Sequence, residues 1–334
     1  MDYLTQEKLA VLGSAGAIGS NIVQAALTLG LTPNIVMFDP FDQGNEGAAE
    51  EIWHCAFPGA RVTWTSDIGR ALDGAAYVIS SGGAPRREGM TREDLLAGNV
   101  KIAADLGQAI KRHCPAASFV VIIFNPADIT GLVTQVHSGL PAGRVSTLAA
   151  LDSTRLQTRL ARHFKLPQDA VSGCRTYGGH GETMAVFSSG VRISGRPLDE
   201  LIGTAELPAG TWEQIKEAVL QGGKRIIQLR GRSSFQSPAH HSVLMLRAVL
   251  DGKGYDWPCG AYVDSARTGF QKILMAMETR LDPEGVHWEM PRGTEAELAG
   301  LRASYQHLVK LRDEVISMGL LPPLEGWTKV NPNL

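Results

Sequence analysis

Short apolar strands alternate with amphipathic helices through the first 150 residues of this chain, and few folds accommodate that alternation. We expect strands at residues 8–12, 34–38, 61–65, 76–80, 119–124 and 145–148. Residues 119–124 are apolar on both faces, which is typical of a central strand in a parallel sheet. In the helical stretch at residues 91–112, Leu95, Ile102 and Leu106 fall on one face. Repeated strand–helix units predict an α/β fold of the Rossmann type, with a doubly wound parallel sheet and right-handed crossovers.

The second half of the chain has a different pattern, with more helix and fewer strands. Helices are expected at residues 152–164, 211–228, 236–250 and 294–318, and strands at residues 272–277 and 286–290. This mixture predicts an α+β unit. We place the division between residues 1–150 and residues 151–334.

Composition excludes several classes of protein. A net charge of −2, with 44% apolar and 20% charged residues, is ordinary for a globular enzyme and argues against a nucleic-acid partner. The longest apolar runs fall short of the roughly 18 residues of a membrane span, and the N-terminus does not resemble a secretory signal. Scattered cysteines favour reduced thiols in a cytoplasmic protein; they are Cys55, Cys114, Cys174 and Cys259. The neighbouring His240 and His241 have no further ligand at a suitable spacing, so no metal site is expected.

A glycine-rich loop follows the first strand and opens the first helix. Its residues, all candidates for cofactor contact, are Gly13, Ser14, Ala15, Gly16, Ala17, Ile18 and Gly19. Such a loop lets the backbone approach a pyrophosphate, and the helix N-terminus adds free N–H groups and positive potential. Asp39 ends the second strand, where a carboxylate accepts from an adenosine ribose and repels a 2′-phosphate, which favours NAD over NADP. The alternative for Asp39 is a turn aspartate before Pro40.

Five ionisable side chains after this loop are candidates for binding an acidic substrate and moving a proton. Arg86 and Arg92 come after a strand and two glycines, which places them on a loop at the carboxyl end of the sheet. Asp152 and Arg155 stand three residues apart at the start of a predicted helix, and His180 lies among glycines. Arginine holds carboxylates in a fixed orientation, and a histidine backed by a carboxylate exchanges a proton. Taken singly, each could be a surface charge, a helix cap or an ordinary polar contact.

The joint occurrence and order of these motifs resemble the malate/lactate dehydrogenase family. The motifs are Gly13-x-x-Gly-x-x-Gly19, Arg86 with Gly89-Met-Thr-Arg92, Asn125-Pro126, Leu151-Asp-Ser-Thr-Arg155 and Gly179-His-Gly181. The resemblance implies that His180 exchanges the proton of the substrate's C2 oxygen and that Asp152 orients it. It also implies that Arg155 anchors the C1 carboxylate and that Arg92, arriving with a closing loop, polarises the C2 oxygen.

The resemblance further implies the substrate, the cofactor groove and the assembly. Arg86 occupies the position that selects the far end of the substrate, and an arginine there implies a second carboxylate, hence malate and oxaloacetate. Asn125 would touch both substrate and nicotinamide ribose, and Asn99 and Ile123 would line the NAD groove. The family also implies a homodimer or homotetramer. The sequence leaves open which of Ser233, Ser234 and Ser237 lines the substrate wall.

Two other functions remain open at this stage. The first is an NAD-dependent dehydrogenase of another 2-hydroxy acid, lactate-like or a different diacid. The second is a catalytically silent NAD-binding protein, although the intact set of Asp152, Arg155 and His180 counts against it.

Overall fold

A computed structural model describes residues 2–84, 92–181 and 183–334 of the chain. Six parallel strands form a doubly wound arrangement in the order β3-β2-β1-β4-β5-β6. They are β1 (Lys8–Leu12), β2 (Asn34–Phe38), β3 (Arg61–Thr65), β4 (Ala75–Ser80), β5 (Phe119–Ile122) and β6 (Val145–Leu148). The predicted Rossmann-type fold is therefore confirmed. Strand β5 ends at Ile122 rather than at Phe124, because the chain turns there toward Asn125 and Pro126.

Three antiparallel strands from the second half of the chain continue the same sheet beyond β6. They are β12 (Cys259–Ser265), β13 (Phe270–Asp282) and β14 (Gly285–Glu289). The junction is direct, because Cys259 pairs with Leu148 and Gly260 with Thr147. Strand β12 was not predicted, since its Cys-Gly-Ala start lacks the β-branched and aromatic residues that mark a strand in sequence.

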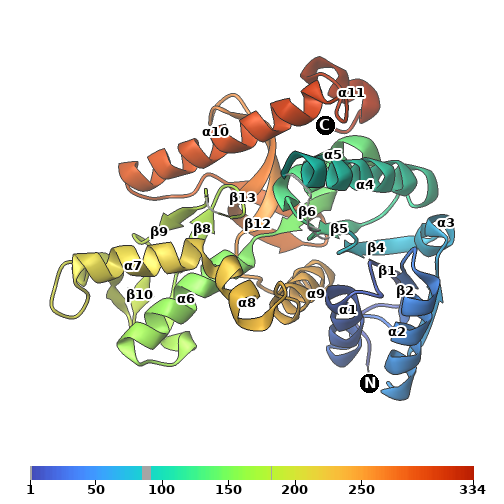
Figure 1. Ribbon diagram of the computed structural model, residues 1–334, viewed down its shortest axis with the longest axis horizontal. Helices are drawn as coiled ribbons and strands as arrows, with labels where there is room; N and C mark the ends of the chain where they lie inside the picture. Colours follow the sequence, from blue (N-terminus) through green and yellow to red (C-terminus); the bar gives the residue numbers. More distant parts are fainter. Residues whose placement is uncertain (1, 85–91, 182) are drawn as a thin grey trace.

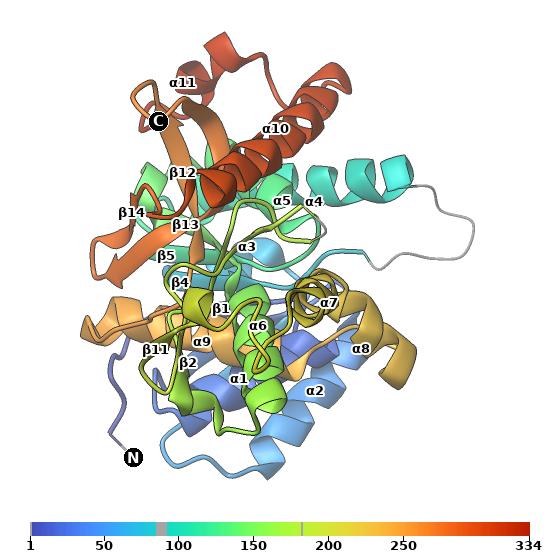
Figure 2. The same ribbon diagram turned by 90° about the vertical axis from the view of Figure 1, so that its left-hand side faces the viewer.

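Helices cover both faces of the sheet (Figures 1 and 2). The alternation of buried side chains along β1 shows which helices share each face. Leu9 and Val11 belong to a core shared with α1, α2 and α9, whereas Ala10 and Leu12 belong to a core shared with α3, α4, α5 and α10. The helices of the first face are α1 (Ala17–Thr28), α2 (Asp42–His54) and α9 (Gln236–Asp251). Those of the second are α3 (Ile68–Leu72), α4 (Arg92–His113), α5 (Ala127–Ser138) and α10 (Glu295–Ser317).

A separate lobe holds a third buried core beside the sheet (Figure 1). Its helices are α6 (Ala150–Phe164), α7 (Ala209–Leu220) and α8 (Gly222–Arg230). Its short strands are β7 (Val171–Ser172), β8 (Arg175–Tyr177), β9 (Ala185–Phe187), β10 (Arg192–Ile193) and β11 (Arg196–Pro197). The prediction of one helix over residues 211–228 was wrong, because the chain breaks at Gln221 into two helices. A Cβ on Gly222 would lie 2.5 Å from Arg155 Cδ, so the break lets the chain pass close to that arginine.

The remaining elements are short. The chain ends in α11 (Trp327–Val330), and single 3-10 turns lie at Ala142–Arg144, Gln168–Ala170, Leu198–Glu200 and Leu324–Gly326. The four cysteines are free thiols; Cys55 is exposed and the other three are buried. In the part of the chain that the structure describes, none of the helices combines the length and apolarity needed to cross a membrane.

Candidate active site

The glycine loop lies at the carboxyl end of β1, against the loop that follows β4. Gly13 has a φ of +82°, and a Cβ on it would lie 2.8 Å from the backbone N and Cα of Gly82. A Cβ on Gly19 would lie 2.2 Å from the Gly13 carbonyl oxygen. Both positions therefore require glycine. Gly13 does so because of its positive φ and its close approach to Gly82, and Gly19 because α1 lies against the glycine loop there.

The N-terminus of α1 is suited to an anion. Gly16 is the N-cap residue and no side chain caps the helix among the described residues, so the N–H groups of Ala17 and Ile18 lie at an open end. Ser14 has a different role, because its buried hydroxyl donates to Asn45 Oδ1 at 2.6 Å and its backbone N–H donates to the Phe38 carbonyl at 3.1 Å. This cradle of backbone groups fits a dinucleotide pyrophosphate.

Asp39 ties the end of β2 to the glycine loop. Its Oδ2 accepts from the Ala15 N–H at 3.3 Å, and its Oδ1 accepts from the Phe41 N–H at 3.0 Å. The second contact is that of a turn aspartate, the alternative considered from the sequence. The first places the carboxylate beside the loop, where a ribose hydroxyl would be bound.

Asn99 joins two loops at the same edge of the sheet. This buried side chain on α4 accepts from the Ala84 N–H at 2.8 Å and donates to the Asn125 carbonyl at 2.7 Å. Asn125 itself is exposed and precedes a cis peptide bond to Pro126. Ile123 is half-buried, and its N–H donates to the Ser80 carbonyl at 3.0 Å. Of the predicted groove residues, Ile123 and Asn125 thus lie on the segment after β5, and Asn99 on α4 joins that segment to the loop after β4.

His180, Asp152 and Arg155 come together around one buried carboxylate. His180 Nδ1 lies 2.7 Å from Asp152 Oδ2, and Arg155 Nη1 donates to Asp152 Oδ1 at 2.7 Å. Only 3% of the Asp152 side chain is exposed, compared with 24% for His180 and 20% for Arg155. The buried carboxylate therefore fixes two partly exposed side chains, and Nδ1–H donation to Asp152 leaves the His180 Nε2 free for a substrate.

A second buried carboxylate, Asp128 on α5, holds the backbone at the same histidine. Its Oδ2 accepts from the His180 N–H at 2.7 Å. Burial raises the pKa of Asp128 to about 6. The pKa of His180 is raised, first by the negative charge of Asp152, with a further contribution from Asp128.

Sequence reasoning missed Asp128, although it stands three residues after Asn125 in the Asn-Pro motif. An acidic residue in the first turn of a helix is usually explained by the helix dipole. The signal that distinguishes this one is the apolar character of its neighbours, because α5 is buried along almost its whole length.

Glycines shape the loop that presents His180. Gly178 has a φ of +87°, and a Cβ on it would lie 2.3 Å from Ser304 Oγ on α10. The Gly179 N–H donates to that same hydroxyl at 2.8 Å, and Gly178 forms a bridge with Ala276 of β13. The histidine loop is thus attached to both α10 and the central sheet.

The structure describes the remaining predicted residues to different extents. Arg86 lies outside the described residues, and the description of Arg92 is limited to its backbone, which begins α4. Ser234 and Ser237 line a cavity of about 390 Å³ together with Arg155, whereas Ser233 is not among the residues that line it.

Both parts of the chain match family models built from known proteins. Residues 7–147 match the lactate/malate dehydrogenase NAD binding domain, and residues 149–317 match the lactate/malate dehydrogenase alpha/beta C-terminal domain. The first match identifies an NAD-dependent oxidoreductase and confirms the predicted cofactor. Since the two matches span most of the sequence, the chain belongs to the lactate/malate dehydrogenase family.

Proteins similar to this chain include both malate dehydrogenases and lactate dehydrogenases. A malate dehydrogenase of Methylobacterium radiotolerans is 34% identical over 291 residues, which is 85% of this chain and 88% of that protein. The crystal structure of Cryptosporidium parvum malate dehydrogenase gives a TM-score of 0.86 at 26% identity, covering 94% of this chain and all of that one. A lactate dehydrogenase of the same organism, complexed with lactic acid and cofactor, gives a TM-score of 0.84 at 29% identity, covering 93% and 98%. Overall similarity therefore does not separate the two substrates.

Proposed function

We propose that this protein is a malate dehydrogenase, which transfers hydride reversibly between (S)-malate and NAD⁺ to give oxaloacetate and NADH. The observation that carries the proposal is the shared carboxylate of Asp152, which holds His180 on one oxygen and Arg155 on the other, each at 2.7 Å. The arrangement puts a proton acceptor beside a carboxylate anchor, as a 2-hydroxy acid requires.

His180 handles the proton. With Nδ1–H donating to Asp152, neutral His180 accepts the C2 hydroxyl proton at Nε2. NAD⁺, when bound, would supply the acceptor for the hydride of C2. Asp152 then stabilises the imidazolium, which agrees in sign with the raised pKa of His180. In the opposite direction, protonated His180 returns the proton to the C2 oxygen.

Arginines bind and orient the substrate. Arg155 uses one donor on Asp152 and has others for the C1 carboxylate. In this proposal Arg86 pairs with the far carboxylate, Arg92 polarises the C2 oxygen, and Asn125 contacts substrate and nicotinamide ribose. Asp39 accepts from the adenosine ribose, while Asn99 and Ile123 line the groove. Residues 1–150 form the cofactor half, residues 151–334 the substrate half, and the chain assembles as a homodimer or homotetramer.

The test is a comparison of 2-oxoacids in an NADH oxidation assay, with NADPH as the cofactor control. We expect fast oxidation with oxaloacetate and slow oxidation with pyruvate. Arg86→Gln is expected to lower kcat/KM for oxaloacetate by about 30-fold or more, because an unmatched charge in a closed site costs about 2–5 kcal/mol. NADH binding should stay unchanged.

A second candidate, a lactate-type dehydrogenase, is favoured by the close structural match to a lactate dehydrogenase. Faster oxidation with pyruvate than with oxaloacetate would select it and reject the role given to Arg86. NADH binding without turnover on either acid would indicate a silent NAD-binding protein.

A further inference from the structure

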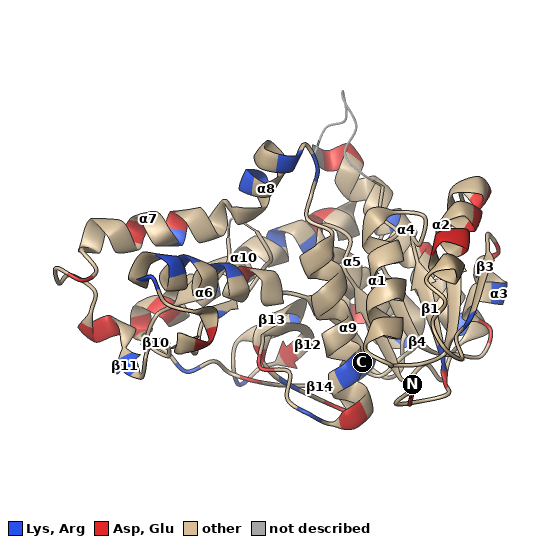
Figure 3. Ribbon diagram, turned by 90° about the horizontal axis from the view of Figure 1, so that it is seen from below, with Lys and Arg blue, Asp and Glu red and all other residues tan. Residues whose placement is uncertain are grey.

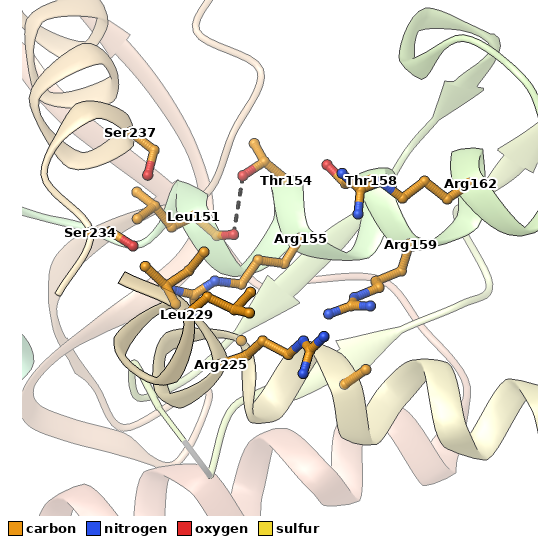
Figure 4. Close-up of a pocket in the computed structure, with 13 residues that line it drawn as sticks. Leu151, Thr154, Arg155, Thr158, Arg159, Arg162, Arg225, Leu229, Ser234 and Ser237 are labelled. Atoms are coloured by element: carbon orange, nitrogen blue, oxygen red, sulfur yellow. Dashed lines mark hydrogen bonds between the residues drawn. The ribbon is translucent and has the colours of Figure 1, made fainter. Parts of the chain in front are cut away.

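A basic cavity lies between α6 and α8, and Arg155 is one of its lining residues. Its volume is about 390 Å³, within the usual range of small-molecule sites. Four arginines line it, Arg155, Arg159, Arg162 and Arg225, together with Ser234 and Ser237 and several apolar side chains (Figure 4). No aspartate or glutamate is among the described residues of this lining.

The arginines form a row rather than a single point. Arg155, Arg159 and Arg162 fall on α6 at spacings of four and three residues, so all three lie along one side of the helix. At 1.5 Å per residue, Arg159 lies about 6 Å and Arg162 about 10 Å beyond Arg155 along the helix axis. Arg225 comes from α8 on the opposite wall, and its guanidinium group and that of Arg159 point toward one another (Figure 4). The row therefore continues well past the carboxylate anchor.

Among the residues that the structure describes, three of these four positive charges have no counter-charge. Arg155 pairs with Asp152, whereas neither a salt bridge nor a hydrogen bond of the Arg159, Arg162 or Arg225 side chain is found within the described ranges. Elsewhere exposed arginines do find carboxylates, as Arg196 does in Glu206. Basic residues gather along α6 and α8 (Figure 3), although the whole chain carries a net charge of −2. Like charges four residues apart destabilise a helix unless an anion balances them.

We propose that this cavity is a second anion site, which binds a small molecule with two or more carboxylate or phosphate groups between Arg159, Arg162 and Arg225. Guanidinium groups pair with both kinds of anion, often through two parallel hydrogen bonds. The ligand would sit beside Arg155 and Gly222, which line the same cavity. Occupancy of the site would therefore alter how firmly Arg155 binds the substrate carboxylate.

The test is isothermal titration of the full-length protein with pyrophosphate and, separately, with citrate at constant low ionic strength. We expect wild-type protein to bind at least one of them, and Arg159→Gln and Arg225→Gln each to raise its Kd by about tenfold or more, the loss of one charge-assisted pair. The preferred probe distinguishes a phosphate ligand from a carboxylate ligand. Lys224→Gln is the matched control, because Lys224 precedes Arg225 on α8, is exposed and does not line the cavity.

The proposal is overturned if neither probe binds, or if all three variants bind it as wild type does. It is also overturned if size-exclusion chromatography shows that Arg159→Gln and Arg225→Gln change the oligomeric state without changing anion affinity, since the arginines would then contact a second copy of the chain. Binding is measured without turnover, so these outcomes are independent of the outcome with oxaloacetate.

Discussion

The two halves of the candidate site offer a ligand different kinds of chemical group. At the glycine loop the chain offers backbone, and the positions that matter, such as Gly13, are those where a side chain would not fit. Around His180 the chain offers side chains, and the carboxylates that matter, Asp152 and Asp128, are buried. Cofactor binding at the glycine loop should weaken when atoms are added there. Activity should fall when a charge or a proton acceptor is removed around His180.

Removal of the proton acceptor should have the largest effect. We expect His180→Asn to lower kcat for malate oxidation by about 10²–10⁴-fold, the usual contribution of general acid–base catalysis. NADH affinity, measured by fluorescence titration, should stay within about twofold of wild type, because the glycine loop is unchanged.

The matched control for this variant is His54→Asn. His54 is an exposed histidine near the end of α2, where its side chain is 78% exposed. It should leave both kcat and NADH affinity unchanged. A His180→Asn enzyme that keeps more than about a tenth of the wild-type kcat would exclude His180 as the proton acceptor.

Adding one methyl group to the loop tests the other half. Gly13→Ala places a Cβ 2.8 Å from Gly82 in a residue with a φ of +82°. Strain of this kind costs about 1–3 kcal/mol, so the Kd for NADH should rise by about 5- to 150-fold while the His180 pKa, followed by NMR, does not move.

Gly47→Ala provides the comparison, because Gly47 lies in α2 and a Cβ there meets nothing within 4 Å. It should bind NADH as wild type does. Circular dichroism would check that the Gly13→Ala protein is folded. A folded Gly13→Ala protein with unchanged NADH affinity would contradict the distinction between backbone and side-chain recognition.

The smallest expected effect is a shift in the pH dependence of malate oxidation. Asp128→Asn keeps an oxygen that can accept the His180 N–H but removes the negative charge that helps to raise the His180 pKa. Malate oxidation requires neutral His180, so activity is lost as pH falls through that pKa. The variant should therefore stay active to lower pH than wild type, with less than tenfold change in kcat at alkaline pH.

The shift should appear only where Asp128 is ionised in wild type, that is, above its pKa of about 6. Profiles of kcat/KM against pH, with NMR titration of the His180 ring, measure it. Asp105→Asn is the control, because Asp105 is an exposed carboxylate on α4. Superimposable profiles for wild type and Asp128→Asn would limit Asp128 to holding the backbone.

Much of the fold followed from local pattern, because strands such as β1 and β2 are apolar after their first residue and have the bounds that the sequence predicted. Strand β12 was not predicted, because pairing with β6 and β13 stabilises the strand conformation of its Cys-Gly-Ala start. The break between α7 and α8 was also missed, although the adjacent Gly222 and Gly223 disfavour a continuous helix there. The contact of Gly222 with Arg155 is a feature of the folded chain.

The candidate site divides in the same way. The types and order of His180, Asp152 and Arg155 could be recognised from sequence, although His180 and Asp152 lie 28 residues apart. Asp128 was missed, because its apolar neighbours indicate burial but not its partner, a backbone N–H 52 residues away. Burial of a charge is a property of the assembled fold and leaves little trace in any short segment.

The continuation of the sheet from β6 into β12 has a consequence for any attempt to divide this protein. Because the histidine loop is bridged to β13 and the glycine loop extends from β1, both are carried by one hydrogen-bonded sheet. A fragment that stopped at residue 150 would expose the β6 edge, a row of unpaired backbone donors and acceptors of the kind that recruits other chains. Separate expression of the two halves should therefore yield aggregating fragments, whereas coexpression gives the β6 edge its natural partner.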